Sequence, residues 1–261
     1  MVEYIKLYLP GMIIKIPTLI NALGLSIFLV SCSGRGSDRE KSEEPMMRTI
    51  SFSGFQWTVD GSGSSRKNPG GNYFSCSEEN VRVDKEGNLH LKITKRNGKW
   101  YCAQVTLKES FAHNRYIFFV SSRVDKLDKN VVGGLFTYLD DSNEIDIEFS
   151  RWGVKDNMNS QFTIQPAYRE GNNYRYQMDL KGRHSTHIID WKKDRIDFAS
   201  YHGHHSERPP EEKIIQEWSY TGNDIPDVSD EKVIINLWLY NGVPPSRNKG
   251  AEMVIKAVRI E

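Results

Sequence analysis

Acidic and apolar residues alternate strictly over 143–149, Asn-Glu-Ile-Asp-Ile-Glu-Phe, and this stretch constrains the fold more than any other. A period of two residues is typical of a half-buried β-strand. Because side chains on a strand alternate between its faces, Glu144, Asp146 and Glu148 share one face. The sequence therefore predicts a strand with an apolar side in a core and three carboxyl groups on its other side.

Three carboxylates about 6.6 Å apart along one strand face repel one another. A strand that had only to fold would do better with Thr or Lys among them. On the floor of a cleft the crowding has a use, because a like charge keeps one carboxyl protonated as an acid while another stays ionised. The alternative is a solvated strand face whose acids are incidental.

The composition bears on the choice of partner. The 261 residues hold 35 Lys and Arg against 34 Asp and Glu, so neither nucleic acid nor an anionic membrane is expected as the main partner. Aromatic residues are plentiful, with 12 Tyr, 11 Phe and 6 Trp. They suit β-strands and also suit sugars, whose rings stack on aromatic faces.

The N-terminus has the pattern of a targeting segment. Lys6 and Lys15 precede a mostly apolar run over 19–30, which is shorter than the roughly 20 residues of a membrane span. The run ends in Leu-Val-Ser-Cys-Ser, which resembles a bacterial lipoprotein box, and the resemblance implies that Cys32 carries the lipid. We expect residues 1–31 to be a signal peptide, with an uncleaved anchor helix as the alternative. The domain is then exported to the bacterial cell envelope, periplasmic or surface-exposed.

A polar segment follows this signal. Residues 33–44 are Ser, Gly and charged residues only, a composition that predicts a flexible tether over 32–46. The folded part is expected over 47–261, a size typical of one β-sandwich. Met12 is a second candidate for the true start, because Met-Ile-Ile-Lys is a more usual opening for a signal peptide.

Short strands separated by turns make up the rest of the chain. No window of eleven or more residues there shows a convincing apolar stripe of helical period. The predicted strands cover 80–84, 89–93, 101–107, 116–120, 131–139, 143–149, 161–164, 174–178, 186–191, 195–201, 233–240 and 252–260. Such a series with regular turns predicts an all-β sandwich.

The cysteine and histidine positions bear on disulfide and metal sites. With Cys32 assigned to the lipid box, Cys76 and Cys102 remain as a pair in an exported chain. This favours a disulfide between them, with two buried thiols as the alternative. The stretch 202–205, His-Gly-His-His, lacks a matched carboxylate or thiol set at ligand spacing, so no metal site is predicted.

With these elements placed, the chain resembles glycoside hydrolase family 16, and most of all its lichenase branch of β-1,3-1,4-glucanases. Glu144-Ile-Asp146-Ile-Glu148 matches that family's Glu-x-Asp-x-Glu signature. Other stretches agree with lichenases in the same order, and they are 72–76, 101–103, 135–138, 187–198 and 235–238. The resemblance covers roughly residues 48–261.

The resemblance implies a β-jelly-roll of two curved antiparallel sheets, a concanavalin A-like sandwich with a substrate groove on its concave face. It also implies a retaining double displacement with Glu144 as nucleophile and Glu148 as general acid and then base. Asp146 would lie between them and tune their proton affinities. Glu144 and Glu148 have Cα atoms about 13 Å apart on a flat strand, so their side chains must lean together to reach the roughly 5–5.5 Å of retaining enzymes.

Further expectations come from the same resemblance. Sugar contacts are assigned to Phe136, Tyr138, Asn236 and Trp238, and Trp152 is a candidate for another groove wall. The alternatives are core packing for Phe136 and Trp238, a satisfied polar strand residue for Asn236 and rim packing for Trp152. A β-linked polysaccharide is the implied partner of a monomer that needs no cofactor and meets the membrane only through its lipid. Lichenase-like domains often carry a structural calcium.

The chain also departs from lichenases. Gln104 and Thr106 stand where lichenases carry a Glu and an Arg that help to hold the glucan. The signature strand is kept while the groove walls differ, so mixed-linkage glucan is one candidate substrate among several. The leading prediction is an endo-acting retaining β-glycan hydrolase. A non-catalytic glycan-binding lipoprotein and a transglycosylase are the alternatives, and a purely structural sandwich leaves the crowded carboxylates without a reason.

Overall fold

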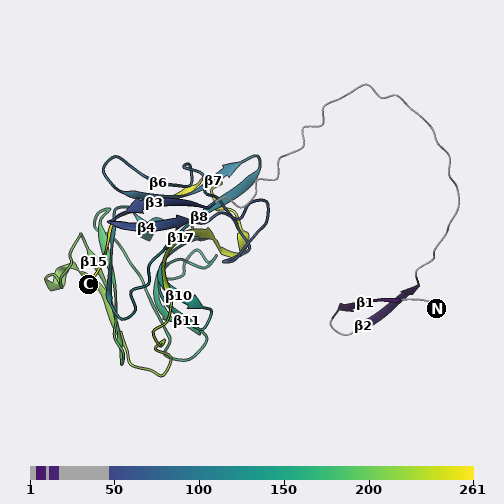
Figure 1. The fold of residues 1–261 in the computed structure, drawn as a ribbon. Helices are drawn as coiled ribbons and strands as arrows, with labels where there is room; N and C mark the ends of the chain where they lie inside the picture. The colour runs from purple at the N-terminus through teal and green to yellow at the C-terminus, as the bar shows by residue number, and fades with distance from the viewer. Residues whose placement is uncertain (1–3, 10–11, 18–46) are drawn as a thin grey trace. The chain divides into compact units, whose positions relative to one another are not determined.

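The computed structural model describes residues 4–9, 12–17 and 47–261 (Figure 1). It divides into two compact units, residues 1–41 and 42–261. In the first unit, β1 (Tyr4–Leu9) and β2 (Met12–Pro17) form an antiparallel pair. The apolar run over 19–30, Cys32 and the expected tether lie outside the described residues, so these assignments stay predictions.

The second unit is an all-β jelly-roll sandwich of two curved, mainly antiparallel sheets. One sheet, called the groove sheet, has the order β13 (Asn173–Tyr176), β12 (Ser160–Ile164), β11 (Asn143–Phe149), β10 (Val131–Asp140), β17 (Lys232–Leu239), β8 (Lys99–Leu107), β4 (Phe55–Val59) and β3 (Arg48–Phe52). The other, called the back sheet, has the order β6 (Val81–Val83), β7 (Leu89–Arg96), β18 (Ala251–Ile260), β9 (Arg115–Val120), β14 (Ser185–Trp191), β15 (Ile196–His202) and β16 (Ile214–Tyr220).

A short hairpin pairing links the two sheets. β7 and β8 pair only at one end, where Thr94 lies opposite Tyr101 and Arg96 opposite Lys99. β5 (Tyr73–Phe74) adds a parallel pairing to β8. The helices of the described residues are three 3-10 turns, η1 (Val124–Lys126), η2 (Glu211–Lys213) and η3 (Tyr240–Gly242). None of them is long and apolar enough to cross a bilayer, and the predicted all-β class is confirmed.

The core lies between the sheets because the strands turn their apolar sides inward. On β11, Ile145, Ile147 and Phe149 are fully buried, and the ring of Phe149 packs on His187 of β14 with centroids 4.7 Å apart. Phe162 of β12 likewise stacks on the back sheet. Because a slip of one residue would turn the acidic side of β11 into this core, apolar packing fixes the strand's register and the direction of its carboxyl groups.

The expected disulfide is not present in the described residues, and that prediction is wrong. No disulfide bond joins Cys76 to Cys102. The parallel pairing of β5 with β8 places Phe74 opposite Cys102, and the Cys76 thiol donates instead to the carbonyl oxygen of Val59, 3.4 Å away. Cys102 is completely buried, and burial raises the pKa of its thiol to about 12. The alternative of buried thiols therefore fits Cys102.

Candidate active site

β10 lies between β11 and β17, and the register of this ladder assembles the site. Each acidic residue of β11 has a neighbour directly opposite on β10, and such neighbours point to the same face of a sheet. The pairs are Glu144 with Tyr138, Asp146 with Phe136, and Glu148 with Gly134. On the other side of β10, Gly134 lies opposite Asn236 of β17. The acidic strand therefore shares its outer face with aromatic and amide side chains.

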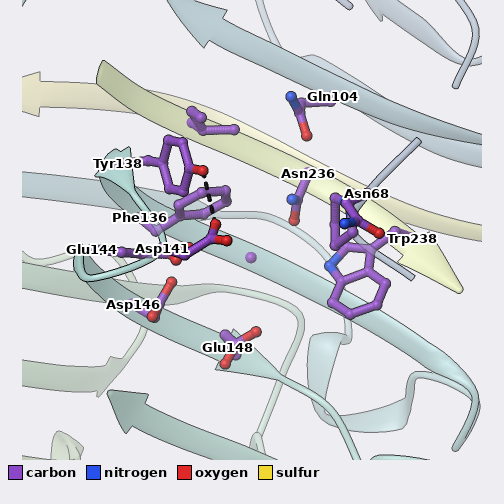
Figure 2. A pocket seen from close by; sticks show the side chains of 13 residues that line it. Asn68, Gln104, Phe136, Tyr138, Asp141, Glu144, Asp146, Glu148, Asn236 and Trp238 are labelled. Atoms are coloured by element: carbon purple, nitrogen blue, oxygen red, sulfur yellow. Dashed lines mark hydrogen bonds between the residues drawn. The ribbon is translucent and has the colours of Figure 1, made fainter. Parts of the chain in front are cut away.

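These side chains surround a cavity of about 250 Å³ on the outer face of the groove sheet (Figure 2). Its lining residues are Asn68, Pro69, Gln104, Gly134, Phe136, Tyr138, Asp141, Glu144, Asp146, Glu148, Ile234, Asn236 and Trp238. All three predicted catalytic residues and four of the five predicted sugar-contact residues are in this set. No basic side chain of the described residues is part of this lining.

Gly134 keeps the floor of the cavity open opposite Glu148. A Cβ atom at this position would lie 2.6 Å from Oδ1 of Asn236 and 3.3 Å from the ring of Phe136. Asn236 is only 2% exposed, and its Oδ1 has no hydrogen-bond partner among the described residues. A buried acceptor without a partner is costly, so a ligand hydroxyl that donates to it would restore a lost hydrogen bond.

Tyr138 and Asp141 form one wall of the cavity, next to Glu144 (Figure 2). The Tyr138 hydroxyl donates to Oδ1 of Asp141 across 2.9 Å. Burial, followed by this hydrogen bond and the charge of Asp141, raises the pKa of Tyr138 to about 12. Tyr138 therefore stays a neutral phenol over the whole range in which the carboxyl groups titrate.

The three carboxyl groups have raised proton affinities. Burial is the main cause for Glu144 and raises its pKa to about 7, although a hydrogen bond with Asp146 acts in the opposite direction. Burial and then the charge of Glu144 raise the pKa of Glu148 to about 7. The pKa of Asp146 lies well above its usual range, because Asp146 is buried between the charges of Glu144 and Glu148. Near neutral pH the site can thus hold a protonated acid beside an ionised carboxylate.

Trp152 does not line the cavity. Its ring packs edge-on against Trp238, with centroids 6.1 Å apart, and against Tyr240 at 5.4 Å. Its indole nitrogen donates to Oε1 of Gln161 across 3.0 Å. Trp152 thus supports a lining residue, as the rim-packing alternative expected, and does not itself form the wall.

Sequence reasoning missed several residues of the site. Gln161 of β12 contacts Glu148 directly, and the local sequence pattern of β12 does not predict this contact. Gln104 was noted only as a departure from lichenases. Its Nε2 donates to Oδ2 of Asp60 across 3.2 Å, and the Thr106 hydroxyl donates to the same oxygen at 2.6 Å. Both replacements are thus hydrogen-bonded to a carboxylate that lies directly after the end of β4.

Groups of side chains that could hold a metal ion are a separate question from the cavity lining. No group of three or more His, Cys, Asp or Glu that could hold a metal ion occurs in the part of the chain that the structure describes. The calcium implied by the resemblance stays an expectation, and no step below depends on a cation.

Comparison with solved structures identifies the class of fold. No protein-family model and no curated protein sequence matches this chain. The β-glucanase of Bacillus licheniformis matches with a TM-score of 0.59 and 19% identity, over 78% of this chain and 91% of that one. A prokaryotic β-1,3-1,4-glucanase (lichenase) from a mouse hindgut metagenome matches with a TM-score of 0.56 and 19% identity, over 78% and 92%.

A third match is to a protein that is itself named a pseudo-glucanase. It is an immunostimulatory antigen and pseudo-β-1,3-glucanase of Mycobacterium tuberculosis, with a TM-score of 0.58 and 18% identity over 78% of this chain and 90% of that one. At these identities the shared property is the fold. The sandwich thus has the fold of the family 16 glycoside hydrolases, as the signature strand predicted.

Proposed function

We propose that the protein is a retaining endo-β-glycan hydrolase that cleaves its substrate by double displacement in the groove-sheet cavity. The observation that carries the proposal is the shared location of Glu144 and Glu148, whose pKa values both lie near 7, in one cavity with aromatic walls. Glycoside hydrolysis requires a pair of carboxyl groups, one protonated as the acid and one ionised.

In the first step, ionised Glu144 attacks the anomeric carbon while protonated Glu148 gives its proton to the departing glycosidic oxygen. The glycosidic bond breaks and a glycosyl ester with Glu144 forms. In the second step, Glu148 takes a proton from water, the water oxygen attacks the anomeric carbon, and Glu144 leaves as a carboxylate. Asp146 lies between them, and its burial and the charges of Glu144 and Glu148 raise its pKa well above the usual range, which favours its protonated form and so limits the charge of the site.

The substrate class follows from the lining and from the neighbours. Four carboxyl groups and no basic side chain surround the cavity in the described residues, so an uncharged polymer suits it better than a sulfated or uronic one. Phe136, Tyr138 and Trp238 offer rings on which sugars can stack. Since several proteins with this fold are named β-glucanases, β-glucans are the first substrates to test.

The test compares the wild type with Glu144→Gln and Glu148→Gln on β-glucans, galactans and xyloglucan. We expect each variant to lower turnover by about 10²-fold or more without loss of the far-UV circular dichroism spectrum. The anomeric form of the first product, read by proton NMR, should match that of the substrate. If wild-type protein cleaves none of these polymers, the proposal fails.

A second candidate function is glycan binding without turnover. It is favoured by the pseudo-glucanase that shares the fold and by the altered pair Gln104 and Thr106, which are hydrogen-bonded to Asp60. Affinity electrophoresis that shows retardation by a glycan without any product would support it. Transglycosylation in the same groove would instead lengthen oligosaccharides, because a sugar hydroxyl then replaces the water of the second step.

We also propose that the domain is displayed on the bacterial envelope as a monomer anchored by a lipid at Cys32. The sequence 29–33, Leu-Val-Ser-Cys-Ser, supports this proposal. Radiolabelled palmitate is expected to enter the wild-type protein and not a Cys32→Ala variant. Equal labelling of both proteins would contradict the anchor while leaving the glycan hydrolase proposal in place.

A further inference from the structure

Gln161 contacts Glu148, and both the amide nitrogen and the amide oxygen of Gln161 form two hydrogen bonds each. Its Nε2 donates to Oε2 of Glu148 across 2.7 Å and to the hydroxyl oxygen of Thr163 across 3.1 Å. Its Oε1 accepts from Nε1 of Trp152 at 3.0 Å and from Nη1 of Arg175 at 2.7 Å. The side chain is buried at 5% exposure, so each of these bonds is made away from bulk water.

The two donors on Oε1 decide which end of the amide faces Glu148. An indole nitrogen and a guanidinium can only donate, so both must point at the amide oxygen. The amide NH₂ is then forced toward β11, where Glu148 lies opposite Gln161 in the register of the two strands. A flipped amide would place its oxygen against the carboxylate and its NH₂ against two donors, so this orientation is fixed by chemistry.

Arg175 is itself held in place by backbone oxygens. Its Nη2 donates to the carbonyl oxygens of Ser150 at 3.3 Å and Met158 at 2.5 Å. Within the described residues it forms no ion pair, as no carboxylate oxygen lies within 4.0 Å of it. Gln161 therefore lies between Arg175 and Glu148. The charge of Arg175 acts on the carboxyl group without a direct ion pair.

We propose that Gln161 is a positioning residue that holds Oε2 of Glu148 and so leaves Oε1 of Glu148 to carry the proton exchanged with the substrate. Trp152 and Arg175 act through Gln161 by fixing its amide. An oxygen that accepts a strong N–H bond is the carbonyl-like oxygen of a protonated carboxyl group, which places the acidic hydrogen on the other oxygen. This inference rests on the proposed function, because the role of Glu148 as general acid gives that hydrogen its purpose.

The charges around Glu148 set the sign of the expected effect. The groups that face it or lie in its cavity are Glu144 and Asp146 on the same strand, Asp141 in the adjoining turn and Arg175 on β13. Burial and the charge of Glu144 raise the pKa of Glu148, whereas the Gln161 hydrogen bond and the charge of Arg175 lower it. Loss of the Gln161 bond should therefore raise the pKa of Glu148 and move the basic limb of the pH profile upward.

The experiment uses the full chain with Gln161→Met and, as a second variant, Trp152→Phe, which removes one donor and keeps a ring against Trp238. Gln177→Met is the matched control, because Gln177 is exposed directly after the end of β13 and its side chain donates to the carbonyl oxygen of Met178. Kinetics of kcat and KM from pH 5 to 9 are combined with a titration of ¹³C-labelled Glu carboxyl groups, with Glu148→Gln used to assign the signal.

For Gln161→Met we expect kcat to fall about tenfold or more with KM little changed, since the acid is misplaced rather than removed. The Glu148 titration and the basic limb should both move to higher pH. Trp152→Phe should move them less in the same direction, and Gln177→Met should leave them unmoved. A purely structural role for Gln161 would lower the melting temperature and leave both titrations in place, and that result would overturn the inference.

The carboxyl titration needs no turnover, so the two proposals fail separately. If wild-type protein cleaves no glycan but Gln161→Met raises the pKa of Glu148, the hydrolase proposal fails and the contact is real. Cleavage by the wild type with an unmoved Glu148 titration in Gln161→Met refutes the positioning role alone. Should Gln161→Met not fold, the same comparison is made with Trp152→Phe, for which an unmoved titration counts against the inference.

Discussion

Replacing Glu148 by Gln is expected to stabilise the protein at pH 8 while removing the proposed general acid. Burial, and then the charge of Glu144, raise the pKa of Glu148 from 4.5 to about 7. One pKa unit corresponds to about 1.4 kcal/mol, so ionising Glu148 in the folded state costs about 3 kcal/mol of unfolding free energy. An amide at this position has no such cost, and its oxygen can still accept from Gln161.

The gain should depend on pH in a defined direction. The folded pKa lies above the unfolded one, so the folded state binds the proton more tightly. The stability that this proton contributes is fully present below about pH 4 and is lost as the pH rises through 7. The unfolding free energy of Glu148→Gln should therefore equal that of the wild type at pH 4 and exceed it by about 2–3 kcal/mol at pH 8. The lower figure allows for the coupled titration of Glu144.

Urea unfolding followed by tryptophan fluorescence at pH 4 and pH 8 measures the difference. Glu86→Gln is the matched control, because Glu86 is exposed in the turn between β6 and β7 and should give no gain at either pH. A gain of the same size at both pH values would point to packing rather than ionisation. A loss of stability at pH 8 would refute the account of the raised pKa.

Three further outcomes follow from individual contacts. Gly134→Ala places a methyl group 2.6 Å from Oδ1 of Asn236, so kcat/KM on the best glycan should fall about tenfold or more, and unchanged kinetics would contradict the described floor. Asn236→Leu removes a buried acceptor without a partner among the described residues, so unfolding free energy should rise by about 1 kcal/mol while glycan affinity falls about tenfold. Calorimetry checks both values, and a loss of stability would argue against the unpaired acceptor. Cys102 is buried with its pKa raised to about 12, so it should react with a thiol reagent only after unfolding in urea, and rapid native labelling would exclude this placement.

The fold and the centre of the candidate site were readable from the sequence because they depend on periodicity. Alternation over 143–149 fixes which side chains of one strand share a face, and the core contact of Phe149 enforces it. The assignment of Phe136, Tyr138, Asn236 and Trp238 came from the resemblance to a family. The cavity brings these four residues beside the acidic strand.

What the sequence did not reveal depends on pairing between distant segments. Gln161 meets Glu148 because β12 lies beside β11 in a particular register, and no local pattern encodes that register. Asn68 reaches the cavity from a loop far from β11 along the chain. The expected Cys76–Cys102 bond rested on the exported compartment and on the two remaining cysteines, whereas the pairing of β5 with β8 places Phe74 opposite Cys102.

The connection between β10 and β11 is only two residues long, Asp141 and Ser142, and both are exposed. It ends beside Glu144, where the Tyr138–Asp141 wall stands. Exposed tips of this kind accept insertions without disturbing the strands they join. A longer connection here would cover the cavity beside Glu144, and the proposed hydrolase would then be expected to retain its polymer between successive cleavages. A single insertion at this connection would thus convert an open cavity into a covered one while the strands and the carboxyl groups stay in place.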